Sequence, residues 1–94
     1  MKRMRKPTTP GEMLKEEFLA PLDLTQRQFA DHLNVEVKTI NRLVNDKTSI
    51  TPLMALKLSA ALGTTPEFWL NLQSATDLWE TQNSNVELPE RISA

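Results

Sequence analysis

Residues 25–45 read TQRQFADHLNVEVKTINRLVN, and this stretch decides the fold. Thr25 and Gln28 match a capping box, in which each side chain bonds the other residue's backbone N–H at the start of a helix. Apolar residues then recur at helical spacing, which predicts one helix over about residues 26–33 and another over about residues 37–45. The side chains expected to face the core are Phe29, Ala30, Leu33, Ile40, Leu43 and Val44.

The link between these two helices is short, since only Asn34-Val35-Glu36 separates them. So short a link forces a sharp crossing, as in the helix-turn-helix that binds DNA. Ala30 supplies a small side chain where the second helix must cross closely, and Val35 can fill the turn. The stretch therefore predicts a helix-turn-helix at about residues 25–45.

The outer face of the second helix is polar and partly basic. At about 100° per residue, the rotation that turns its apolar residues inward turns Lys38, Arg42 and Asn45 outward. Basic side chains reach guanine acceptors or phosphates, and Asn can pair with adenine through two hydrogen bonds. Gln26 opens the first helix, where backbone N–H groups can meet a phosphate. The predicted DNA-binding residues are Gln26, Val37, Lys38, Thr39, Asn41, Arg42, Asn45, Lys47 and Thr48.

Simpler roles compete with DNA contact on this face. A polar outer helix face is ordinarily only solvated, so the interpretation depends on the buried framework beneath it as well. Asn45 lies near a helix end, where Asn often adopts the left-handed cap conformation. Gln28 is expected to complete the cap of the first helix rather than to contact DNA.

Three Thr-Pro pairs mark further helix starts, because Thr is a good N-cap and Pro is favoured at the first helical position. They predict helices over about residues 10–20, 52–62 and 66–82, the first of which buries Leu14 and Phe18. The helix over residues 52–62 is apolar nearly all round, which is typical of the buried centre of a bundle. In the last helix, the residues expected to face the core are Phe68, Leu72, Ala75 and Trp79.

The order of these elements predicts an all-α fold, a compact five-helix bundle. A chain of 94 residues suits one hydrophobic core. The bundle is expected to form one domain over residues 9–82. A flexible basic arm is expected at residues 1–8 and a loose tail at residues 83–94.

Composition indicates a soluble, cytoplasmic protein that is not an enzyme. The chain has no cysteine, which fits a reducing compartment, and no window of the ~20 apolar residues that a membrane span needs. His32 is the sole histidine and no Gly-rich phosphate loop is present, so no cofactor, metal or catalytic group is expected. The net charge of −1 argues mildly against nucleic acid, but residues 1–50 carry nine basic and seven acidic side chains. The motif therefore lies in the more basic half of the chain.

Residues 25–45 resemble the helix-turn-helix of the Cro/cI or XRE type, which has a five-helix, phage-repressor-like fold. The flanks are more specific and resemble HigA-type antitoxins. They read PGEMLKEEFL at residues 10–19, followed by Pro21-Leu22, and ALGTTPEFWLNLQ at residues 61–73. The resemblance covers about residues 8–80. Members often have Gly after the Asn that ends the second helix, whereas Asp46 stands here, so the departure bears on the loop that follows.

The resemblance implies a type II toxin–antitoxin system. Its antitoxin would bind a HigB-like toxin that cleaves mRNA at the ribosome, and would repress the operon of both genes. Such proteins are usually dimers, which fits double-stranded operator DNA with two half-sites one helical turn, ~34 Å, apart.

A dimer interface is predicted on physical grounds in the helix over residues 66–82, which is more apolar than one core face requires. The alternative is that its two Trp residues only cover a small core. The predicted interface residues are Trp69, Leu70, Leu78 and Trp79.

Two other functions fit the same motif. A solitary phage- or plasmid-type repressor would share every DNA-binding feature and would lack an adjacent toxin gene. A protein-interaction module could keep the fold without DNA binding, and the near-neutral charge favours this alternative. Salt dependence separates it, because phosphate contact makes the logarithm of the affinity fall with the logarithm of the salt concentration.

Overall fold

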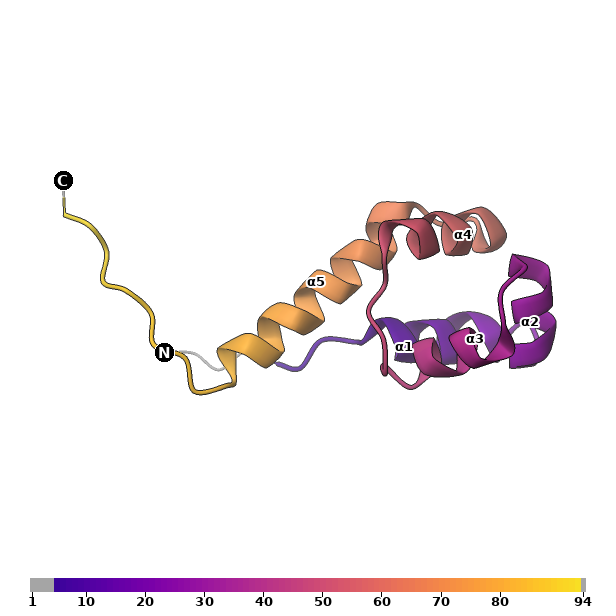
Figure 1. The fold of residues 1–94 in the computed structure, drawn as a ribbon, viewed down its shortest axis with the longest axis horizontal. Helices are drawn as coiled ribbons and strands as arrows, with labels where there is room; N and C mark the ends of the chain where they lie inside the picture. The colour runs from indigo at the N-terminus through magenta and orange to yellow at the C-terminus, as the bar shows by residue number, and fades with distance from the viewer. Residues whose placement is uncertain (1–4, 94) are drawn as a thin grey trace.

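The computed structural model describes residues 5–93. Residues 1–4 of the predicted basic arm and Ala94 of the predicted tail lie outside the described residues. The described part is helical without strands, as the all-α prediction requires (Figure 1). Its elements are α1 (Pro10–Glu12), η1 (Met13–Leu19), α2 (Gln26–Leu33), α3 (Val37–Val44), α4 (Pro52–Leu62) and α5 (Pro66–Gln82).

Side-chain caps fix the helix starts where the Thr residues predict them. The hydroxyls of Thr9, Thr51 and Thr65 each accept a hydrogen bond from the backbone N–H three residues later, at 3.1, 3.2 and 3.2 Å. Thr25 and Gln28 form both bonds of the capping box, at 3.0 and 2.9 Å. The expected role of Gln28 as a cap is thereby confirmed.

The first predicted helix is present, but most of it is a π-helix. In η1 backbone N–H groups bond carbonyls five residues back, and the N–H of Ala20 donates to the carbonyl of Lys15 at 3.0 Å. Leu14 and Leu19 are buried and Phe18 is half-buried, whereas α-helical spacing paired Leu14 with Phe18. The wider turn brings the residues four and five positions after Leu14 to the core side, so that Phe18 and Leu19 both pack there.

The core lies between the layer of α1, α2 and α3 and the layer of α4 and α5 (Figure 1). All the core residues predicted for the helix-turn-helix are buried, as expected. The largest fully buried side chains are Trp69, Phe29, Leu14, Ile40 and Leu58.

The prediction for the inner face of α5 is correct only in part. Phe68 and Leu72 are half-buried and pack against the core as predicted, and Trp79 is half-buried. Ala75 is exposed, whereas Trp69 and Thr76, which were not predicted to face the core, are the buried residues of this helix. Trp69 can occupy the centre of the core because its indole N–H donates to the hydroxyl of Thr64 at 2.7 Å.

The prediction that α4 is buried all round is also wrong. Ala55, Leu58 and Ser59 face the core, whereas Leu53 and Leu56 are 63% and 57% exposed. α4 packs against α2 and α5 and lies at the edge of the molecule, so neighbouring helices cover only one of its sides (Figure 1).

The described chain is elongated, with principal extents of 54 × 22 × 21 Å. The C-terminal half of α5 extends beyond the other helices, and residues 83–93 continue from it without helix or strand (Figure 1). At this end the Lys6 ammonium lies 5.9 Å from the centre of the Trp79 ring, which is within cation–π range. Within residues 5–93 no helix is both long enough and apolar enough to cross a membrane.

Candidate nucleic-acid interface

The turn between α2 and α3 has the geometry that the short link predicts. Asn34 ends α2 in the left-handed conformation, with φ 58° and ψ 47°. The N–H of Val35 donates to the carbonyl of Ala30 at 3.0 Å, and the Val35 side chain packs half-buried against the core. Ala30 is 0% exposed, so the small side chain lies where the two helices meet. The short link, the Val35 side chain that fills the turn and the small Ala30 together hold α3 across α2.

The outer face of α3 is exposed where the helical rotation predicts it. Lys38, Asn41 and Arg42 are exposed, and Val37 at the start of the helix is 39% exposed. Thr39 lies at the side of the helix and is half-buried. The opposite side of α3 is held in the core, so its outer face is presented to solvent on a rigid support.

Gln26 and Asn41 form a direct contact between α2 and α3 that the helical pattern does not predict. The amide nitrogen of Asn41 donates to the side-chain oxygen of Gln26 at 3.1 Å. This bond leaves the amide hydrogens of Gln26 and the side-chain oxygen of Asn41 for other partners. Because the two side chains hold each other, DNA lying against this face would meet amide groups of Gln26 and Asn41 that are already oriented.

Asn45 at the end of α3 is not in the left-handed conformation that was one of its two expected roles. Asn45 caps the helix with φ −100°, and its side-chain amide donates to the carbonyl of Asn41 at 2.9 Å. The left-handed residue is instead Asp46, with φ 53°. The position after the Asn that ends α3 therefore has a left-handed backbone, and Asp is one of the residues that tolerate it.

Asp46 also binds the start of α1. One carboxylate oxygen accepts from the backbone N–H of Gly11 at 2.9 Å, and the other accepts from the hydroxyl of Thr9 at 2.6 Å. Sequence reasoning missed these contacts because the partners are more than thirty positions apart and no local pattern joins them. They lock the end of α3 to the first helix.

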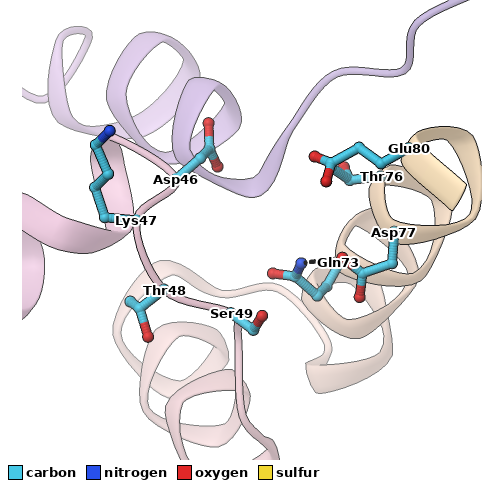
Figure 2. Close-up of a pocket in the computed structure, with 8 residues that line it drawn as sticks. All are labelled: Asp46, Lys47, Thr48, Ser49, Gln73, Thr76, Asp77 and Glu80. Carbon is cyan, nitrogen blue, oxygen red and sulfur yellow. Dashed lines mark hydrogen bonds between the residues drawn. The ribbon is translucent and has the colours of Figure 1, made fainter. Parts of the chain in front are cut away.

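Lys47 and Thr48 lie in the loop after α3, and both are exposed as a phosphate contact requires. Behind the loop a polar cavity of about 150 Å³ separates it from α5. Figure 2 shows Lys47 extending away from α5, whereas Gln73, Thr76 and Glu80 project from α5 toward the loop. Asp46, Ser49 and Asp77 complete the lining, with Lys47 and Thr48.

The predicted dimer residues of α5 fall into two groups. Trp69 is 0% exposed and lies within the core of its own chain, so its assignment to a dimer surface is wrong. Leu70 and Trp79 are half-buried, and Leu78 is 54% exposed on the part of α5 that extends from the bundle. A partner can therefore reach Leu78 without any change in the core.

Known proteins share both this motif and its flanks. The helix-turn-helix family model matches residues 14–69. Antitoxin HigA-1 of Vibrio cholerae serotype O1 is 49% identical over 86 residues, which cover 92% of this chain and 81% of that protein.

Solved structures share the fold over nearly the same range. Antitoxin GraA in complex with its operator has a TM-score of 0.85 at 36% identity, covering 100% of this chain and 99% of that one. The Pseudomonas aeruginosa antitoxin HigA with the higBA promoter has a TM-score of 0.74 at 32% identity, covering 86% of this chain and 96% of that one.

The identity to HigA-1 extends past the helix-turn-helix on both sides, because the aligned part takes in 92% of the chain. Both flanks that resemble this family, at residues 10–19 and 61–73, lie inside it. The chain belongs to the HigA antitoxin family of helix-turn-helix proteins.

Proposed function

We propose that the protein is a cytoplasmic antitoxin that binds operator DNA as a dimer, represses its own operon and neutralises a HigB-like, mRNA-cleaving toxin. The observation that carries the DNA part is the outer face of α3, which is polar, free of acidic side chains and exposed over a buried framework. Two related structures, those of GraA and of the Pseudomonas HigA, are complexes with an operator and a promoter.

The residues divide into base-reading and backbone-contacting groups. Lys38 and Arg42 face outward from α3 and are suited to guanine acceptors or to phosphates. Asn41 and Asn45 offer amides to adenine, and the exposed methyl groups of Val37 suit a thymine methyl. Phosphate contact is assigned to Gln26, Lys47 and Thr48, and Thr39 at the side of α3 can serve either a base or the backbone.

The dimer and the toxin complete the proposal. Two copies joined through Leu78, Trp79 and Leu70 on α5 would present two α3 helices to successive turns of the major groove. The proposed toxin neutralisation is inferred from membership of the HigA family and acts by binding the toxin.

Operator binding tests the DNA part. Lys38→Ala and Arg42→Ala should each weaken binding by ~1–3 kcal/mol if the side chain reads a base, because the partner group on the base is left without its hydrogen bond. The measurement is a titration of the DNA upstream of the gene by fluorescence anisotropy at several salt concentrations. Lys57→Ala on α4 is the control and should bind like the wild type. If both α3 variants matched the wild type, the assigned face would be wrong.

Growth separates an antitoxin from a solitary repressor. The neighbouring small gene is induced with and without this protein, and with Arg42→Ala. We expect growth arrest that the wild type relieves. Relief by Arg42→Ala as well would show that toxin binding does not need this operator-reading side chain. Absence of toxicity, or toxicity that the protein does not relieve, would leave a repressor without a toxin.

A further inference from the structure

We infer that Gln73 on α5 is a positioning residue for DNA binding, which holds the loop at residues 47–49 in the form that meets the phosphate backbone. The inference rests on the proposed function, because it concerns the same DNA contacts. It goes beyond that function by assigning a role to a residue that lies on another helix and that no DNA-reading pattern includes.

Gln73 joins α5 to the end of this loop through its side-chain oxygen, and its side-chain nitrogen forms a bond within α5. Its side-chain oxygen accepts from the backbone N–H of Ile50 at 2.9 Å. Its nitrogen donates to a carboxylate oxygen of Asp77, one turn further along α5, also at 2.9 Å (Figure 2). The bond to Asp77 sets which end of the amide faces Ile50. The side chain of Ile50 is itself 6% exposed, so the anchored end of the loop is part of the core.

The other end of the loop is held as firmly. Asp46 accepts hydrogen bonds from Thr9 and from the N–H of Gly11, and the N–H of Lys47 donates to the carbonyl of Arg42 at 2.8 Å. The loop is thus fixed at both of its ends, and the side chains between them, those of Lys47, Thr48 and Ser49, are exposed. Of these anchors, the one from Gln73 is the more distant from the helix-turn-helix, because it comes from α5.

The cavity explains why the Gln73 anchor matters. About 150 Å³ of polar space lies between the loop and α5, so side chains do not fill the space behind the loop. A loop that is free in solution must lose conformational entropy when DNA binds it, whereas a loop that is already held loses less. Gln73 therefore acts on DNA affinity through Lys47 and Thr48, without touching the DNA itself.

The first test replaces Gln73 by Ala, which keeps helix propensity and removes both hydrogen bonds. Operator affinity should fall roughly three- to tenfold, the effect of removing one ordering hydrogen bond. The slope of log affinity against log salt should also become shallower, by up to ~0.9 for each phosphate that the loop no longer neutralises. A purely structural role would leave this slope unchanged. Gln82→Ala at the exposed end of α5 is the matched control and should keep the wild-type slope and affinity.

The second test asks whether Gln73 works through the loop. In a background with Lys47→Ala and Thr48→Ala, Gln73→Ala should have no further effect on the salt slope, as a double-mutant cycle requires for residues that act through one contact. The paired change Gln73→Glu with Asp77→Asn keeps the total charge and an acceptor for the Ile50 N–H, and reverses the donor and acceptor within the side-chain pair. It should restore affinity and slope toward wild-type values.

The third test does not need DNA. Amide hydrogen exchange of Ile50, and NMR order parameters for residues 47–49 in the free protein, should show faster exchange and lower order in Gln73→Ala than in the wild type. These signals report the loop even if Gln73→Ala lowers the melting temperature.

The outcomes separate this inference from the proposed function. The positioning role is overturned, and operator binding stands, if the wild type binds its operator and Gln73→Ala keeps the wild-type salt slope. The same conclusion follows if Gln73→Ala lowers the slope equally in the wild type and in the Lys47→Ala, Thr48→Ala background. The positioning role is likewise overturned if hydrogen exchange of Ile50 and the order parameters of residues 47–49 are the same in free Gln73→Ala as in the free wild type. If the wild type binds no operator at any salt concentration, the proposed function fails and the positioning role fails with it.

Discussion

Gly11 and Gly63 are the two glycines of the chain, and each is required for a different physical reason. A Cβ on Gly11 would lie 2.5 Å from the carbonyl oxygen of Leu43 and 2.7 Å from that of Val44. Gly63 has open space around it, but it ends α4 with φ +73°, where side chains are disfavoured. The first glycine permits close approach of two helices, and the second permits a turn.

Gly11→Ala should therefore be the more destabilising of two otherwise identical changes. The atoms that its methyl group meets are backbone oxygens, which cannot rotate away, so we expect a loss of ~1–3 kcal/mol or more from overpacking. Gly63→Ala should cost about 1 kcal/mol from the left-handed backbone alone. Urea unfolding followed by circular dichroism gives both free energies. A Gly11→Ala protein at least as stable as Gly63→Ala would show that α1 does not approach α3 as closely as described.

Single residues also show which contacts sequence reasoning reaches. Thr25 and Gln28 are three positions apart, and their capping box is readable because helix geometry alone brings them together. Asp46 and Gly11 are 35 positions apart, and Gln73 and Ile50 are 23 apart. Their contacts depend on how the helices pack, so no local sequence pattern predicts them.

α4 shows how an element can be predicted correctly and its environment wrongly. Its bounds, Pro52–Leu62, follow from the Thr51 cap and from Gly63 at its end. Its composition is apolar on every side, so helical periodicity cannot identify the buried face. Packing against α2 and α5 leaves Leu56 57% exposed and Leu58 fully buried, because the two residues are two positions apart and point to nearly opposite sides of the helix.

Replacing Leu56 or Leu58 by Ala should distinguish the exposed side of α4 from its buried side by the loss of stability. Leu58→Ala should destabilise the fold by ~2–5 kcal/mol, because it removes apolar contacts and leaves a cavity. Leu56→Ala should change stability by no more than ~0.5 kcal/mol, as is usual for surface positions. Thermal and urea unfolding of the two variants provide the comparison. Equal losses in both would mean that a partner or another part of the chain covers Leu56.

The described part of the molecule is a helical bundle with one projecting helix end. The bundle contains the proposed DNA face, and the projecting half of α5 carries exposed Leu78 beside Trp79, over which Lys6 lies. An exposed large apolar residue on a helix that leaves the bundle is typical of an interface between subunits. This arrangement keeps the proposed dimer contact away from α3.

Leu78→Glu should convert the proposed dimer to a monomer, because it would place a charge in the proposed apolar contact. Sedimentation velocity measures the change in mass. Operator affinity should fall by about 100-fold or more, since the two half-sites are then no longer bound by linked copies. Leu88→Glu, the same change in the exposed segment after α5, is the control and should leave a dimer. A dimeric, folded Leu78→Glu protein would place the interface elsewhere.

Local chemistry in the sequence was sufficient for the helix bounds, the caps, the helix-turn-helix and the polar face of α3, because all of these depend on residues within one or two turns of each other. Packing between elements settled the rest. Trp69 lies in the core and not on the predicted surface, because the neighbouring helices cover that side of α5. The contacts of Asp46 with the start of α1 and the bond from Gln73 to Ile50 likewise join parts of the chain that are far apart in sequence. Helical periodicity specifies which residues share a face, and the three-dimensional arrangement of neighbours specifies what that face touches.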